Sequence, residues 1–86
     1  MSEYWVALKS SAEKELLGLP DIVLTRIFTK IESLASNPRP TGSKKLRGGK
    51  DLWRIRVGDS RAIYAIDDET KVVQVMRIAH RREVYE

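Results

Sequence analysis

The residues best suited to a chemical role are arginines in the second half of the chain. Arg54 and Arg56 alternate with apolar residues, and Arg61 follows after a Gly58-Asp59 pair. Guanidinium groups stay charged at any physiological pH and hold a phosphate through two parallel hydrogen bonds. The chemistry open to these residues is therefore phosphate binding, or stabilisation of the charge that develops on a phosphate during its transfer.

The spacing of the arginines predicts that they meet on one face of a hairpin. Gly58-Asp59 is typical of a two-residue hairpin turn, which places Arg56 opposite Arg61. Because residues directly opposite share a face, Arg54 joins them, and a loop of three residues would instead shift the register. Facing like charges are unfavourable, so this arrangement favours a phosphate ligand over arginines that merely face solvent. The other face should carry Trp53, Ile55, Ala62 and Tyr64.

The C-terminal segment adds candidates for proton transfer. It contains His80, Arg81 and Tyr85. If the substrate is RNA, attack by the ribose 2′-hydroxyl needs a base and an acid besides charge stabilisation. Arginine remains protonated, so the base is His80 or Tyr85. We assign Tyr85 as the base and Arg81 or His80 to the leaving-group side.

The charge distribution also indicates an anionic partner. The net charge is +4, yet residues 1–43 hold five basic and five acidic residues, whereas residues 44–82 hold eleven basic and five acidic ones. Trp53 could stack on a base, but its alternation with apolar residues favours the core. Five further basic residues either form the rim of a nucleic-acid groove or a solvated surface: Lys44, Lys45, Arg47, Lys50 and Arg82.

Composition excludes several other kinds of site. The chain has no cysteine and one histidine, which excludes disulfides, thiolate ligands, a two-histidine ribonuclease site and a multi-histidine zinc site. No acidic cluster accompanies the arginines, so we expect neither a metal nor a cofactor. No apolar run approaches the roughly 20 residues that span a membrane, and we expect a cytoplasmic protein.

The elements that must position these residues follow from periodicity. We expect a strand at residues 4–8, a short helix that starts with a capping box at Ser10 and Glu13, and a helix at 20–36. Strands are expected at 52–57, 61–66 and 71–79. This β-α-α-β-β-β order predicts one α+β domain over residues 1–86. It should have a mostly antiparallel four-stranded sheet with both N-terminal helices packed on one face.

Four segments together resemble a known family of toxins. They are KLRG at 45–48, WRIRV at 53–57, SRAIY at 60–64 and HRREVY at 80–85. In this order they are similar to the RelE/ParE superfamily of type II toxin–antitoxin toxins, and more to its RelE-like branch. The resemblance covers nearly the whole chain and implies the family's fold.

The resemblance also implies an activity, partners and residue roles. RelE-like toxins are ribosome-dependent, metal-independent endoribonucleases that cut messenger RNA in the ribosomal A site. A cognate antitoxin inactivates them and binds operator DNA together with them. The family's site positions fall on Arg54, Arg56, Arg61, Arg81 and Tyr85. Well-known members have lysines at the first two positions, so charge stabilisation rather than proton transfer is expected there. The alternatives are a ParE-like inhibitor of DNA gyrase and a non-catalytic RNA-binding module.

Overall fold

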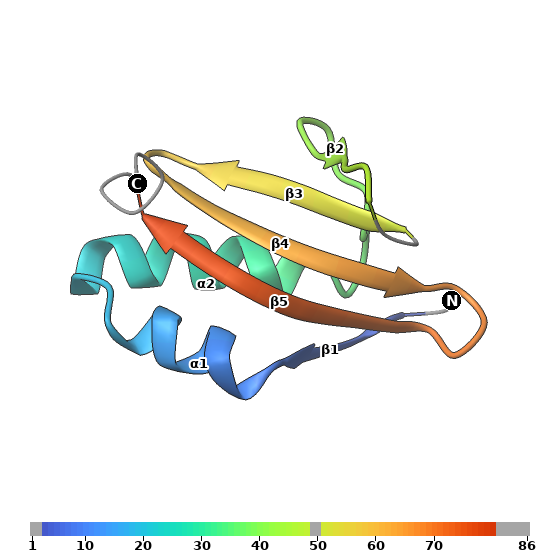
Figure 1. Cartoon of the computed structure of the whole chain (residues 1–86), viewed down its shortest axis with the longest axis horizontal. Helices are drawn as coiled ribbons and strands as arrows, with labels where there is room; N and C mark the ends of the chain where they lie inside the picture. The colour runs from blue at the N-terminus through green and yellow to red at the C-terminus, as the bar shows by residue number, and fades with distance from the viewer. Residues whose placement is uncertain (1–2, 49–50, 81–86) are drawn as a thin grey trace.

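The computed structural model describes residues 3–48 and 51–80 as a mixed sheet with two helices (Figure 1). Strand β1 (Trp5–Leu8) leads into helices α1 (Ser10–Leu17) and α2 (Asp21–Ser33). The strands β2 (Lys44–Lys45), β3 (Leu52–Val57), β4 (Ser60–Asp67) and β5 (Val72–His80) follow. Their order in the sheet is β1-β5-β4-β3-β2, with β1 parallel to β5 and every other pairing antiparallel. The predicted α+β class is confirmed.

The sheet has five strands where the sequence predicted four. The additional strand is β2, in a segment where we expected no strand. Lys44 pairs with Arg54 and Lys45 with Trp53. A strand of two residues is too short to show the alternation from which strands are recognised in a sequence.

The hairpin between β3 and β4 has the predicted register. Val57 pairs with Ser60, Arg56 with Arg61 and Ile55 with Ala62. Gly58 has a φ of +60° at the first position of the two-residue turn, a conformation that glycine adopts without strain. The two faces of the hairpin therefore differ as the alternation of apolar and basic residues requires.

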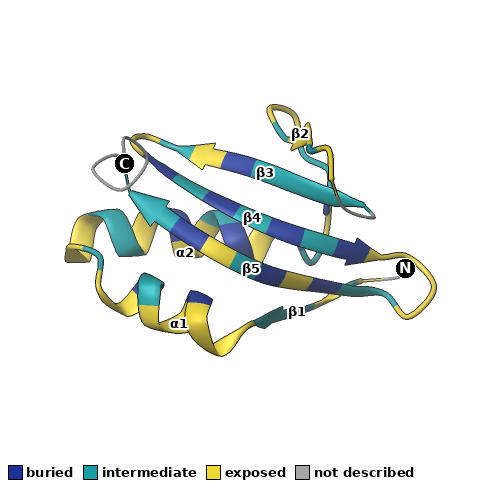
Figure 2. Cartoon of the chain, viewed as in Figure 1, coloured by how far each residue is buried: buried dark blue, intermediate teal, exposed yellow. Residues whose placement is uncertain are grey.

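Both helices pack on the apolar face of the sheet. Ala12 and Leu16 of α1 and Ile27 and Ile31 of α2 belong to one core with the inward residues of the sheet. Burial alternates along β4, as Figure 2 shows. The buried strand residues of this core are Ile55, Ala62, Tyr64, Ile66, Val73, Val75 and Ile78. In the ranges that the structure describes, no helix is long and apolar enough to span a bilayer.

The helix termini differ from the prediction in two details. Helix α1 begins at Ser10, but Lys9 is the N-cap residue and no side chain caps the helix. The expected capping box is therefore wrong, because the Ser10 hydroxyl lies one residue past the capping position. Helix α2 runs over Asp21–Ser33 rather than 20–36, since a turn follows before Asn37.

A bulge in β5 changes which of its residues face the helices. Tyr64 pairs with Val75 while its neighbour Ile63 pairs with Arg77, so Met76 is an extra residue in β5. Before the bulge Val73 and Val75 face the core, and after it Ile78 does. A bulge shifts the alternation by one residue. It thereby turns Arg77 away from the core.

Polar contacts stabilise the end of the sheet where β3 begins and β4 ends. Arg39 forms ion pairs of 3.0 Å with Asp51 and 2.9 Å with Asp68, and its guanidinium lies 5.3 Å from the centre of the Trp53 ring. Trp53 donates a hydrogen bond of 2.8 Å to Asp51 and packs against the core, as its alternation predicted. The loop after α2 is thus attached to the start of β3.

Candidate functional site

Arg54, Arg56 and Arg61 lie on the sheet face opposite the helices, here called the arginine face. Arg56 and Arg61 are directly paired across β3 and β4, and Arg54 is paired with Ile63. Arg54 is the diagonal neighbour of Arg61, at roughly 7–8 Å between backbones. The predicted clustering of the three arginines is confirmed.

The arginine face carries positive charge that the described residues do not neutralise. None of its three arginines forms an ion pair within residues 3–48 and 51–80. Burial lowers the pKa of Arg54, and the neighbouring charges of Arg56 and Arg61 lower it further. The Nε atom of Arg54 is buried and has no hydrogen-bond partner in the described part of the chain. A buried donor without a partner is costly, and an anion bound here would satisfy it.

The remaining basic candidates lie around this face. Lys44 shares the face because it pairs with Arg54, whereas Lys45 pairs with Trp53. Both lysines and Arg47 are exposed. Lys50 and Arg82 lie outside the described residues, as do the catalytic candidates Arg81 and Tyr85. RNA binding by these five basic residues stays a prediction.

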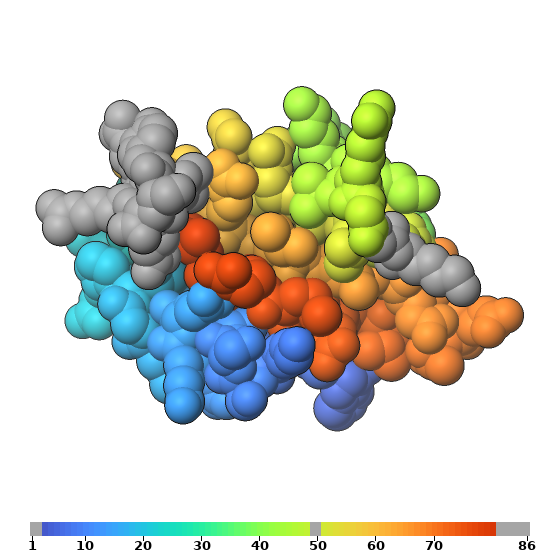
Figure 3. All heavy atoms as spheres, in the orientation of Figure 1, coloured from blue at the N-terminus to red at the C-terminus, as the bar shows by residue number. Residues whose placement is uncertain are grey.

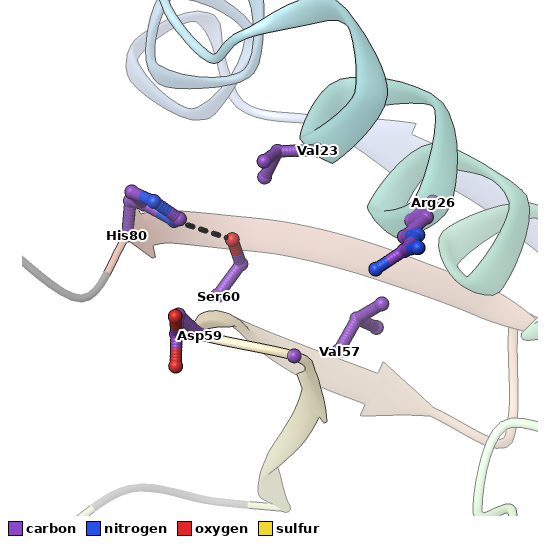
Figure 4. Close-up of a pocket in the computed structure, with 7 residues that line it drawn as sticks. Val23, Arg26, Val57, Asp59, Ser60 and His80 are labelled. Carbon is purple, nitrogen blue, oxygen red and sulfur yellow. Dashed lines mark hydrogen bonds between the residues drawn. The ribbon is translucent and has the colours of Figure 1, made fainter.

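His80 lies on the helix side of the sheet, away from the three arginines. It pairs with Ser60, whose side chain is only 1% exposed, and its Nδ1 is 2.9 Å from the Ser60 hydroxyl. Figure 4 shows this hydrogen bond beside a hollow of about 180 Å³ between α2 and the hairpin. Val23, Arg26 and Val57 also line the hollow. Ser60 therefore holds the imidazole on the face opposite the arginine cluster.

Arg77 joins the arginine face, although the sequence reading did not include it. It pairs with Ile63 and lies diagonal to Arg61, which pairs with Ala79. Strict alternation from Val75 would place Arg77 toward the helices and His80 toward the arginines. The bulge at Met76 exchanges the two, and no residue of β5 is a sequence signal for that bulge.

The arrangement suits an anion more than a metal ion. The described residues contain no group of three His, Cys, Asp or Glu side chains that could hold a metal. The arginine face instead offers guanidinium donors in an open sheet surface. Such donors bind a phosphodiester and stabilise the extra negative charge of a pentavalent phosphate.

Comparisons with known proteins identify related toxins. Residues 6–85 match the family model described as the ParE toxin of the type II toxin–antitoxin system parDE. The toxin RelE of Mycobacterium tuberculosis is 32% identical over 83 residues, which cover 95% of this chain and 86% of that protein. The toxin–antitoxin complex RelBE2 of the same organism matches with a TM-score of 0.81, 30% identity and 94% coverage of both chains. The isolated E. coli RelE toxin matches with a TM-score of 0.79 and 30% identity, covering 95% of this chain and 90% of that one.

Proposed function

Because the chain belongs to the RelE/ParE superfamily of type II toxin–antitoxin toxins, we propose that it is an endoribonuclease that inhibits translation. Its proposed substrate is messenger RNA in the ribosomal A site. The single observation that carries this proposal is the arginine face, whose three guanidinium groups form no ion pair among the described residues and where the buried Nε of Arg54 has no hydrogen-bond partner among them. RNA supplies the phosphates that such a surface would bind.

The proposed reaction is an attack of the ribose 2′-hydroxyl on the adjacent phosphorus. A bond forms between the 2′-oxygen and phosphorus, and the bond from phosphorus to the 5′-oxygen breaks. The products are a 2′,3′-cyclic phosphate and a 5′-hydroxyl end. A base takes the proton of the 2′-hydroxyl, and an acid protonates the leaving 5′-oxygen. In this scheme Arg54, Arg56 and Arg61 stabilise the charge of the pentavalent phosphate, so that no metal ion is needed.

The proton-transfer roles are proposed for the C-terminal segment. Tyr85 is the proposed base, and Arg81 assists the leaving group. The placement of His80 beside Ser60, on the helix side of the sheet, supports giving these roles to other residues than His80. The chain has few titratable groups for this reaction, and the ribosome adds to the rate by orienting the RNA for attack.

Partners follow from the same proposal. The similar M. tuberculosis toxin was solved in a toxin–antitoxin complex. We extend this to the present chain, with a cognate antitoxin that neutralises it and links it to operator DNA. The proposed place of action is the cytoplasm, where ribosomes translate.

The rival function is inhibition of DNA gyrase, which the parDE description of the matching family model favours. The RelE names of the similar proteins and the arginine face favour the nuclease.

The test is to induce the protein in bacteria and to map new 5′ ends of messenger RNA. Arg61→Ala and Tyr85→Phe are compared with wild type, and Lys30→Ala serves as the control because α2 lies on the other side of the sheet.

The nuclease predicts cuts within translated codons that Arg61→Ala reduces by orders of magnitude and Tyr85→Phe abolishes. Lys30→Ala should cut like wild type. Growth arrest without new RNA ends would refute the nuclease and support gyrase inhibition. An unchanged Arg61→Ala variant would show that the arginine face is not the site.

A further inference from the structure

We propose that Arg77 and Arg61 form a second phosphate subsite for single-stranded RNA. This subsite binds the phosphodiester next to the one that is cleaved. This inference rests on the proposed nuclease function and specifies how its substrate is held. A hollow of about 170 Å³ separates the two arginines on the arginine face. Ile63 and Ala79 line it between them.

The strand order makes this subsite distinct from the Arg54–Arg56 side. Arg61 lies on β4, with Arg56 beside it on β3 and Arg77 diagonal to it on β5. Two strand spacings separate β3 from β5, or roughly 10 Å. One phosphate group does not bridge that distance, so a phosphate held by Arg61 and Arg56 leaves Arg77 for a neighbouring one. Arg61 is then shared between two consecutive phosphates of the strand.

Contacts from α1 orient Arg77 for this role. Its Nε donates a hydrogen bond of 3.0 Å to Glu15, whose other carboxylate oxygen accepts the backbone N–H of Ile78 at 2.8 Å. Figure 3 shows α1 directly against β5 at the molecular surface. Glu15 thus engages the Nε edge of the guanidinium, and the side chain of Arg77 remains 61% exposed. Its two terminal nitrogens are those that form a fork toward a phosphate.

The ion pair with Glu15 also predicts what kind of effect Arg77 has. The carboxylate of Glu15 offsets part of the positive charge of Arg77. The other three arginines of this face, Arg54, Arg56 and Arg61, form no such ion pair within the described residues. A flanking phosphate keeps the same charge throughout the reaction, so Arg77 binds ground state and transition state equally. Loss of such uniform binding raises KM and leaves kcat unchanged.

The test is a double-mutant cycle between Arg77 and the substrate. Ribosomes are programmed with messenger RNAs in which a neutral methylphosphonate replaces the phosphate on either side of the cleaved one. With the unmodified RNA, Arg77→Ala should raise KM about tenfold, the size typical of a hydrogen bond to a charged group. With one of the two modified RNAs, the further rise in KM should be about tenfold smaller for Arg77→Ala than for wild type, because the variant has already lost the Arg77 contact and keeps only that of Arg61.

Additive losses with both modified RNAs would overturn the subsite. So would a KM for Arg77→Ala equal to that of Lys30→Ala, the control on α2. Arg77→Lys, which keeps the charge but not the fork, should give an intermediate KM, and it is the variant to use if Arg77→Ala unfolds. Failure of wild type to cleave any of the RNAs would refute the proposed function itself, which is a separate result.

Discussion

Replacing Arg54 by methionine should stabilise the fold while it abolishes cleavage. Methionine keeps a long apolar stem on β3 and removes the guanidinium group. Its removal eliminates the buried Nε that has no hydrogen-bond partner in the described chain, a defect that costs about 1–3 kcal/mol. It also relieves the repulsion from Arg56 and Arg61, which together with burial lowers the pKa of Arg54. After subtraction of lost packing, we expect a gain of about 1 kcal/mol in the free energy of unfolding.

The measurement is urea or thermal unfolding of the isolated protein. For a domain of this size, about 1 kcal/mol raises Tm by roughly 4–8 °C. Arg56→Met is the matched control, since Arg56 lies on the same strand and face but is exposed. It should change stability by less than about half as much, because only repulsion is relieved.

A destabilised Arg54→Met variant would refute this reasoning, because it would show that the guanidinium makes net favourable contacts in the free protein. Inorganic phosphate gives a second measurement. It should raise the Tm of wild type more than that of Arg54→Met, since a ligand that binds only the folded state stabilises it. Equal shifts would show that phosphate does not bind at Arg54.

Three further predictions concern residues outside the arginine face. Ser60→Ala should lower the free energy of unfolding by about 1–2 kcal/mol, measured in urea, because the hydrogen bond between the buried Ser60 hydroxyl and His80 is lost. Hydrogen bonds from Arg39 hold the pKa of Asp68 below its usual range. The stabilisation they give is therefore present above the ordinary pKa of aspartate and is lost as the pH falls through the lowered pKa of Asp68. In Asp68→Asn, the free energy of unfolding should depend less on pH in this acidic range. Burial raises the pKa of Tyr64 to about 12, so stability should fall as the pH rises from about 10 through about 12. The increase in phenolate absorbance should be smaller in Tyr64→Phe by the contribution of one of the three tyrosines of the chain.

Much of the fold could be predicted because local signals agree with the tertiary structure. Gly58-Asp59 fixes the turn, and alternation on both sides of it fixes the register of β3 and β4. In the helix expected at 20–36, apolar residues recur every three or four positions and form one stripe, and its members Ile27, Ile31 and Leu34 are buried. Phe28 lies on the same stripe and is exposed, because it is at the edge of the contact with the sheet.

The rest depends on contacts between distant segments. The bulge at Met76 lies where β5 pairs with β4 on one side, and next to it Glu15 of α1 accepts the backbone N–H of Ile78. Neither neighbour is visible in the sequence of β5 itself. The placement of Arg77 and His80 follows from that bulge, and therefore these were the two site residues that alternation could not assign.

The position of β5 in the sheet determines when the protein can become harmful to the cell that makes it. The strand is synthesised after every other described element, yet it lies between β1 and β4. A nascent chain that ends before Val72 contains the hairpin with Arg54, Arg56 and Arg61, but it lacks the strand that joins this hairpin to β1 in the described sheet. Since β1, β4 and α1 all pack against β5, premature termination or early proteolysis yields fragments that cannot hold the arginines on a folded sheet. Toxicity is in this way coupled to the synthesis of β5.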